Sequence, residues 1–335
     1  MTQYISGRMQ RGFTIVELLI VIVVIAILAA ITIVAYNGIQ NQARRASLQS
    51  DASQATKQIQ AFAVNNAETF PSSISSCPTP TSTAICLRQS GDNTATYVVD
   101  NSFSPRSYCY STTASNGDSY YTDQSGQVLP GNCSQQSCYA IQQSGGAHGS
   151  GTYWIQPSSA SQPMRVYCDM ERAGGGWTLL MTNPGPQTLW NSVTYTELNA
   201  QRPSISQGYS ILAHANAIKS NVSGNLQYRI DGEALGRWGG VFSAPFSTSL
   251  QSTSAQTVAT LTQQFDSWTL DTTPADGTQA LSTTVPWISS SYGITTWGGS
   301  GNWFGTLATN HSGWSPAPYI NGPKTNPGSI WYWVR

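Results

Sequence analysis

The sequence predicts an α+β protein in which a long N-terminal α-helix and a small antiparallel-sheet head precede a mixed, loop-rich C-terminal domain. Three observations predict this order. An uncharged apolar run extends from Leu18 to Tyr36, no proline occurs before Pro71, and all 11 tryptophans lie between Trp154 and Trp333. The length of 335 residues fits about two folded domains rather than one.

Composition points to an exported protein. Only 9% of the residues are charged, compared with roughly 25% in an ordinary globular protein, and 15 basic residues balance 15 acidic ones. This balance gives no electrostatic basis for nucleic-acid binding, so no nucleic-acid partner is expected. Six cysteines without a CxxC motif or a Cys/His cluster predict three disulfides formed in an oxidising compartment.

The apolar run is long enough to cross a membrane, because nineteen helical residues span about 28 Å. Arg8 and Arg11 precede the run and predict a cytoplasmic N-terminus with the rest of the chain outside. An ordinary secretory signal would have a shorter apolar core and a small-x-small cleavage site, and neither is present. A single-pass membrane segment over residues 18–36 is therefore expected.

The residues around the run, RGFTIVELLIVIVVIAILAAI, resemble the N-terminus of type IV pilins and pseudopilins. The resemblance implies that residues 1–12 are a leader, that prepilin peptidase cuts between Gly12 and Phe13, and that Phe13 becomes N-methylated. It further implies a precursor in the cytoplasmic membrane that assembles with other pilin subunits into an extracellular pilus. A plain signal anchor, with Glu17 in the headgroup region, is the alternative.

Glu17 is a lone acid at the edge of the apolar run. An ionised carboxylate in this position is costly unless it is paired. We expect the new α-ammonium group of Phe13 on a neighbouring subunit to neutralise it during extraction from the membrane. Glu17 is therefore predicted to act in assembly.

The helix is predicted to extend over residues 13–66, because apolar residues continue beyond the span at spacings of 4, 3, 4 and 3. They form one stripe on the outer half of the helix: Leu48, Ala52, Ala55, Ile59 and Phe62. A coiled-coil stalk is the alternative, but it needs a longer repeat. The stripe is expected to pack on a small sheet.

A small head is expected over residues 67–133. Three β-like runs occupy residues 94–99, 107–111 and 119–122, and Asn116-Gly117 forms the turn between the last two. Four cysteines in this region allow three pairings. We favour Cys77–Cys86, which closes a loop, and Cys109–Cys133, which ties the end of the head to its middle strand.

From Cys138 onward three motifs follow in order: Gly-x-Tyr-x-Ile-x-Pro at 151–157, Tyr-Cys-Asp-Met at 167–170 and Gly-Gly-Gly-Trp-Thr at 174–178. They resemble the opening of fibrinogen C-terminal-like domains, including intelectin-type lectins and bacterial relatives, and SIWYWVR at the end resembles their final strand. The resemblance implies one domain over residues 134–335 and a disulfide between Cys138 and Cys168. Residue types independently predict strands at 153–155, 165–168 and 177–181, with a structural turn at the three glycines.

The calcium loop of vertebrate relatives is not reproduced. No cysteine follows Cys168, and Asp266, Asp271 and Asp276 do not have the spacing of that loop. A calcium ion is the only cofactor that the resemblance suggests, and the sequence assigns no residues as its ligands.

A ligand site is expected in the segment 295–323, which is rich in glycine, asparagine and aromatic residues. Rigid rings beside amides and hydroxyls suit sugars, and by the resemblance this late segment contributes the recognition pocket. The candidate residues are Trp297, Asn302, Trp303, His311, Trp314 and Tyr319. The alternative is that most of these tryptophans lie in the core.

No enzymatic activity is predicted. The three histidines, His148, His214 and His311, are far apart, and neither HExxH nor GxSxG occurs. His148 lies in GGAHGSG, which is expected to be a flexible surface loop.

These observations together predict a minor pilin that acts as an adhesin at a filament tip and binds a host or target-cell glycan or glycoprotein through its C-terminal domain. Two alternatives stay open. One is a structural initiator or capping pseudopilin of a pilus or type II secretion-like system, without ligand binding. The other is a pseudopilin that recruits an exported cargo protein.

Overall fold

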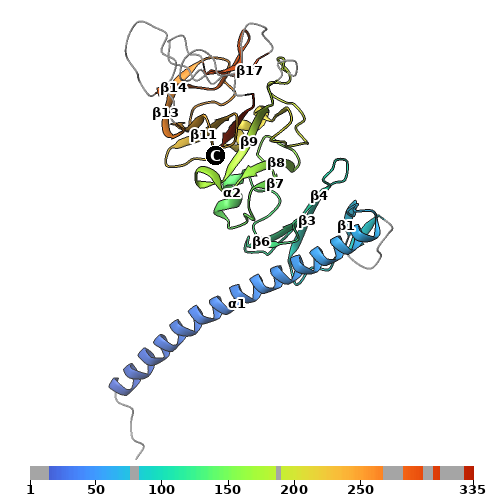
Figure 1. Cartoon of the computed structure of the whole chain (residues 1–335). Helices are drawn as coiled ribbons and strands as arrows, with labels where there is room; N and C mark the ends of the chain where they lie inside the picture. Colours follow the sequence, from blue (N-terminus) through green and yellow to red (C-terminus); the bar gives the residue numbers. More distant parts are fainter. Residues whose placement is uncertain (1–14, 76–82, 186–189, 267–281, 297–304, 310–327) are drawn as a thin grey trace, which may run out of the picture.

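The computed structural model describes residues 15–75, 83–185, 190–266, 282–296, 305–309 and 328–335. Figure 1 shows a long helix, a small sheet against its outer half, and a larger β-rich domain on the far side of that sheet from the helix. The expected α+β class, with a long N-terminal helix and a sheet-rich C-terminal domain, is confirmed.

Helix α1 (Ile15–Asn65) has 51 residues and is therefore about 76 Å long. Its first half is exposed, whereas Leu48, Ala52, Ala55 and Ile59 of the expected stripe are buried. Phe62, the last residue of that stripe, is half-buried and packs against the same core. The helix ends where Ala67 and Glu68 adopt positive φ angles of 51° and 59° and the Glu68 N–H donates to the Ala63 carbonyl.

The head contains a short parallel pair and a four-stranded antiparallel sheet in the order β3-β4-β5-β6. The strands are β1 (Ser73–Ser75), β2 (Ala84–Cys86), β3 (Thr94–Asp100), β4 (Ser107–Thr113), β5 (Ser119–Asp123) and β6 (Val128–Pro130). Strands β3, β4 and β5 occupy the three expected runs. Gly117, with φ of 89°, lies in the expected turn between β4 and β5.

Both faces of the four-stranded sheet are covered, and alternate residues along each strand serve different faces. One set of side chains points toward α1 and forms a core cluster with it. This set includes Tyr97, Tyr108, Tyr110, Tyr120 and Val128. Their immediate neighbours Val98, Cys109, Tyr121 and Leu129 form a second cluster with Trp154, which belongs to the next domain. The head is therefore a layer between the helix and the C-terminal domain.

The C-terminal domain is built on an antiparallel sheet in the order β14-β13-β12-β11-β18-β9-β8-β7, with β10 paired to β9. Its strands are β7 (Gly151–Ile155), β8 (Met164–Asp169), β9 (Trp177–Asn183), β10 (Tyr209–Ser210), β11 (Asn225–Gly232), β12 (Gly239–Pro245), β13 (Gln256–Phe265), β14 (Ser282–Val285) and β18 (Ile330–Val334). The last strand inserts between β11 and β9, so the end of the chain completes the centre of the sheet.

Shorter elements surround this sheet. They are α2 (Cys138–Gln143), η1 (Arg172–Gly174), η3 (Leu212–His214), α3 (Ala215–Ile218) and a three-stranded sheet of β15 (Trp287–Ser289), β16 (Gly293–Thr295) and β17 (Thr306–Ala308). Among the described tryptophans, Trp154, Trp177, Trp190, Trp331 and Trp333 are buried. The expected strands at 153–155, 165–168 and 177–181 lie within β7, β8 and β9.

The three glycines form a turn that only glycine fits. Gly174, Gly175 and Gly176 all have φ between 71° and 84°. A methyl group on Gly175 would lie 2.2 Å from the Met170 carbonyl oxygen. The Arg335 guanidinium donates to the carbonyls of Ala173 and Gly175 at 3.2 and 2.9 Å. The final strand therefore holds this turn in place, and the expected structural role of the glycines is confirmed.

Strands β7 and β8 form the contact with the head. Tyr153, Ile155 and Val166 belong to the core of the C-terminal domain, whereas the cross-strand pair Trp154 and Arg165 faces the head. Beside this pair, the Tyr121 hydroxyl donates to the Gly146 carbonyl. A methyl group on Gly146 would lie 2.6 Å from the Pro130 carbonyl oxygen and 3.1 Å from the Tyr121 ring.

Replacing Gly146 with alanine is expected to weaken the docking of the two domains, because the new methyl group meets a backbone oxygen that cannot rotate away. Overpacking of this kind costs about 1–3 kcal/mol of unfolding free energy. Thermal unfolding and limited proteolysis of the connector at residues 131–137 will measure it. Gly151→Ala is the matched control, since nothing lies within 4 Å of its added methyl group. Equal stability of the two variants would contradict the close packing at Gly146.

Candidate functional site

The described part of the N-terminal region begins with helix α1. Glu17 lies in its first turn, where a carboxylate interacts favourably with the helix dipole. Gly12 and Phe13 lie outside the described residues, so cleavage, N-methylation and the pairing of Glu17 with Phe13 stay predictions.

The first half of α1 presents an exposed and predominantly apolar surface. The large apolar residues between Ile15 and Ile39 are 46–83% exposed within the chain. An 18-residue window of this helix has a mean hydropathy of 3.4 and none of it is buried. By length and composition the helix could cross a membrane, and its apolar surface needs either lipid or other apolar helices around it.

The junction between head and C-terminal domain contains a buried ion pair. Arg165 Nη1 donates to Asp100 Oδ2 at 3.0 Å, and only 5% and 14% of the two side chains are exposed. The Arg165 Nη2 also donates to the Pro105 carbonyl at 3.3 Å. A buried charge is tolerated when it is paired and hydrogen-bonded. The pair therefore fixes the orientation of β8 on the head.

The expectation that His148 lies in a flexible surface loop is wrong, because its side chain contacts the head. Its Nε2 lies 3.1 Å from Asp123 Oδ2 of the head. Its ring stacks on Tyr153 at 4.4 Å, and its backbone N–H donates to the Tyr153 hydroxyl. The hydrogen bond to Asp123 raises the pKa of His148, while burial opposes the shift. Sequence spacing could not identify this pair, because its partner is 25 residues away in another domain.

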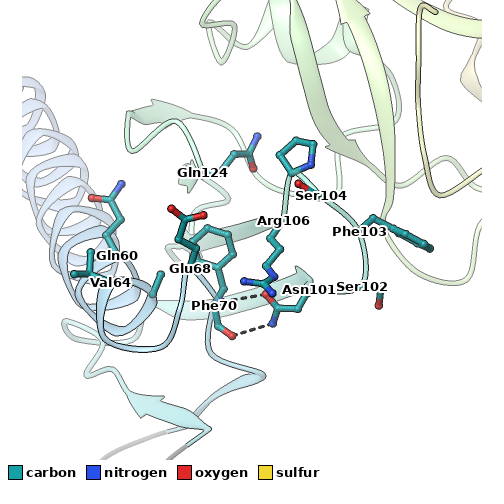
Figure 2. A pocket seen from close by; sticks show the side chains of 12 residues that line it. Gln60, Val64, Glu68, Phe70, Asn101, Ser102, Phe103, Ser104, Arg106 and Gln124 are labelled. Carbon is teal, nitrogen blue, oxygen red and sulfur yellow. Dashed lines mark hydrogen bonds between the residues drawn. The ribbon is translucent and has the colours of Figure 1, made fainter. Parts of the chain in front are cut away.

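A cavity of about 820 Å³ opens where the end of α1 meets the loop between β3 and β4 (Figure 2). Several polar atoms in its wall already have partners. The Asn101 side chain accepts a hydrogen bond from the Phe70 N–H and donates one to the Phe70 carbonyl. The Arg106 guanidinium donates to the Ala67 carbonyl at 2.6 Å. Because these groups hold the loop rather than face the cavity as free donors, we assign no ligand to it.

Arg229 is the centre of a buried charge cluster in the C-terminal domain. Its Nη2 lies 2.8 Å from Asp169 and 3.0 Å from Asp231, and all three side chains are fully buried. The Trp333 indole N–H donates to Asp231 at 2.7 Å, and the Trp333 ring centroid lies 4.6 Å from the guanidinium carbon. Asp169 belongs to the Tyr-Cys-Asp-Met motif, so this motif has a structural role.

Arg229 lowers the pKa of both carboxylates of this cluster, but the net shifts have opposite signs. Burial alone would raise the pKa of Asp169, but the Arg172 backbone N–H and the Arg229 guanidinium together lower it. At Asp231 burial prevails, and the pKa is raised in spite of Arg229. The sequence analysis missed this cluster. The available signal was Arg229-x-Asp231 in one strand, which places both side chains on one face.

The structure joins Cys109 to Cys133 and Cys138 to Cys168, the pairs that the sequence analysis favoured. Cys86 is also disulfide-bonded, and Cys77, its expected partner, lies outside the described residues. Each of the two described bonds lies within one domain.

The expected ligand-site residues, which are Trp297, Asn302, Trp303, His311, Trp314 and Tyr319, all lie outside the described residues. The described ends of the segment 297–304 are joined, because Thr296 and Gly305 exchange backbone and side-chain hydrogen bonds. Within the described ranges no group of three or more His, Cys, Asp or Glu side chains could hold a metal ion. Asp266 pairs with Arg237 at 3.2 Å, and Asp271 and Asp276 are not described.

The contact between His148 and Asp123 is expected to make domain docking pH-dependent. A raised folded-state pKa gives a stabilisation that is fully present below the unfolded value of about 6.5 and is lost as the pH rises through the folded value. The melting temperature should therefore differ more between wild type and His148→Gln at about pH 5.5 than at about pH 9. Asp123→Asn should likewise lower the melting temperature relative to wild type more at about pH 5.5 than at about pH 9. A gap of equal size at both pH values would show that the pair makes no pH-dependent contribution.

Comparison with known proteins finds two separate matches. Residues 7–33 match the prokaryotic N-terminal methylation motif. Residues 134–191 match the family described as fibrinogen beta and gamma chains, C-terminal globular domain.

Individual curated relatives match short stretches of the chain. Human angiopoietin-4 is 45% identical over 53 residues, which are 16% of this chain and 10% of that protein. The fibrinogen beta chain of Petromyzon marinus is 49% identical over 43 residues, which are 13% of this chain and 9% of that protein. The chain thus spans about a tenth of the length of these curated relatives.

Solved structures give matches at lower identity. The fibrinogen-like globe domain of human ANGPTL2 covers 60% of this chain and 98% of its own, at 14% identity and a TM-score of 0.34. Lamprey fibrin D-dimer, complexed with the peptide Gly-His-Arg-Pro-amide, covers 68% of this chain and 54% of its own, at 17% identity and a TM-score of 0.25. By its two sequence matches, the chain joins a type IV pilin-type N-terminal methylation motif to a fibrinogen-like C-terminal domain.

Proposed function

We propose that this protein is a minor type IV pilin that acts as a filament adhesin and has no catalytic activity. Its C-terminal domain binds a glycan or glycoprotein on a target surface through the segment that contains Trp297, Asn302, Trp303, His311, Trp314 and Tyr319. Prepilin peptidase and other pilin subunits are its assembly partners. The precursor resides in the cytoplasmic membrane, and the mature protein resides in an extracellular pilus.

One observation carries the proposal: an exposed apolar helix and a fibrinogen-like domain lie on opposite faces of one small sheet. If apolar helices pack together in the centre of a filament, the head lies outside them and the C-terminal domain lies outside the head (Figure 1). This arrangement supports display of a binding domain to the surroundings.

The size of the C-terminal domain supports a terminal or sparse position. A domain of about 200 residues on every subunit would crowd a filament whose subunits repeat closely. We therefore place this subunit at the tip or at scattered positions along the filament. The tip is also where a binding domain first meets a surface.

Glu17→Val is expected to leave leader cleavage intact and to impair filament incorporation, because the carboxylate that would pair with the Phe13 ammonium of a neighbour is lost. N-terminal sequencing of the membrane-bound protein measures cleavage, and immunoblots of sheared filaments measure incorporation. Glu197→Val removes an exposed acid of the C-terminal domain and is the control. Normal incorporation of Glu17→Val would refute the pairing.

The ligand site is tested with the full chain in non-ionic detergent on a glycan array, with calcium and with a chelator. Combining His311→Ala with Trp314→Ala should weaken binding at least about tenfold, because aromatic contacts dominate binding energy, and should leave the melting temperature unchanged. The control combines His214→Ala with Trp238→Ala in the same domain.

Three results would overturn parts of this proposal. Absence of glycan binding by the folded protein would favour a protein receptor or a capping role. A fall in melting temperature of the double variant would show that the two residues belong to the core and not to a ligand site. Binding that survives in the double variant would place the glycan elsewhere, and sensitivity to the chelator would reveal a calcium requirement.

A further inference from the structure

A second pocket, of about 450 Å³, lies between the head and the C-terminal domain. The β3–β4 loop of the head contributes Ser102, Phe103 and Ser104, and the C-terminal domain contributes Thr152, Arg165 and Arg202. Figure 2 shows the Phe103 side chain directed away from helix α1. The pocket exists only while the two domains are docked, and none of its lining residues belongs to the segment 297–319.

Arg202 is a cation held in place without an acidic partner. Its guanidinium carbon lies 3.7 Å from the centroid of the Phe103 ring, so the flat group is stacked on the ring. The side chain is exposed, and no carboxylate pairs with it among the described residues. Stacking leaves the N–H groups at the edge of the guanidinium available to a carboxylate.

Arg165 contributes a second positive charge from the wall of the pocket. The residue is only 4% exposed, and its charge is balanced by Asp100. Its Nε, in contrast, has no hydrogen-bond partner in the described part of the chain. Two arginines against one aspartate leave the pocket with one excess positive charge.

The remaining wall is polar but uncharged. The hydroxyls of Ser102, Ser104 and Thr152 have no hydrogen-bond partner within the described ranges. A volume of about 450 Å³ is within the range of small-molecule sites. One excess charge matches a monoanion better than a dianionic phosphate, and three free hydroxyls match a ligand that carries hydroxyls of its own.

We propose that this pocket binds the carboxylate of an acidic sugar, such as a uronic acid. Arg202 holds the carboxylate through two parallel N–H···O bonds, which is the geometry that its planar fork favours. The serine and threonine hydroxyls bond the sugar hydroxyls. The site does not depend on the proposed adhesin function, because the pocket is formed whether or not the segment 297–319 binds a ligand.

Isothermal titration of the full chain in non-ionic detergent with sodium glucuronate tests this site. Wild type should bind glucuronate and should bind neither glucose nor glucuronate methyl ester measurably. Arg202→Gln should weaken binding at least about tenfold, and Arg202→Lys, which keeps the charge without the fork, should lie between the two. Arg44→Gln, which removes an exposed arginine of α1, should bind like wild type.

The proposal is overturned by absence of glucuronate binding by wild type, by equal binding by wild type and Arg202→Gln, or by equal binding of the methyl ester. Inorganic phosphate is titrated in parallel, and phosphate binding as tight as that of glucuronate would refute the carboxylate assignment. Equal melting temperatures of wild type and Arg202→Gln will show that a lost titration signal is not caused by unfolding.

Discussion

The structure depends on the two-sided burial of the four-stranded head sheet. Antiparallel sheets commonly pack one face on a core and leave the other to solvent. Here Tyr108 and Tyr110 pack on α1, and Cys109 between them packs toward the fibrinogen-like domain. Because side chains alternate with a period of two, a register slip of one residue would turn every helix-facing residue toward that domain. Helix, sheet and C-terminal domain are thereby held in one arrangement.

Local patterns predicted the elements well. The spacing of Leu48, Ala52, Ala55 and Ile59 fixed the face of α1 that packs on the head, because helical periodicity depends only on neighbouring residues. Runs of aromatic and β-branched residues likewise located β3, β4, β5 and β7. What these patterns could not predict was that both faces of the head sheet are buried, since β4 and β5 mix tyrosine with serine and threonine instead of forming a long apolar run.

The functional groups at the junction were not predictable for a related reason. Asp100 and Arg165 are 65 residues apart, and Phe103 and Arg202 are 99 apart, so no single segment contains a recognisable motif. His148 lies among glycines and has the composition of a loop, yet Asp123 and Tyr153 enclose it. The buried Arg229 cluster shows the same limit, because Asp169 meets it from a strand 60 residues earlier. Sequence patterns identify elements, whereas these contacts arise when separate domains or strands meet.

The Cys109–Cys133 bond has a mechanical consequence for a protein whose two ends are held apart. Tension between α1 and the C-terminal domain enters the head at Cys133, because only a short connector separates this residue from Cys138. The disulfide passes that tension directly to Cys109 in β4, an inner strand of the sheet. Residues 110–132, including the edge strand β6, form a covalently closed loop that carries none of it. The β6 edge of the head therefore cannot be peeled open by pulling, and the covalent load path through the sheet runs along β3 and the first part of β4.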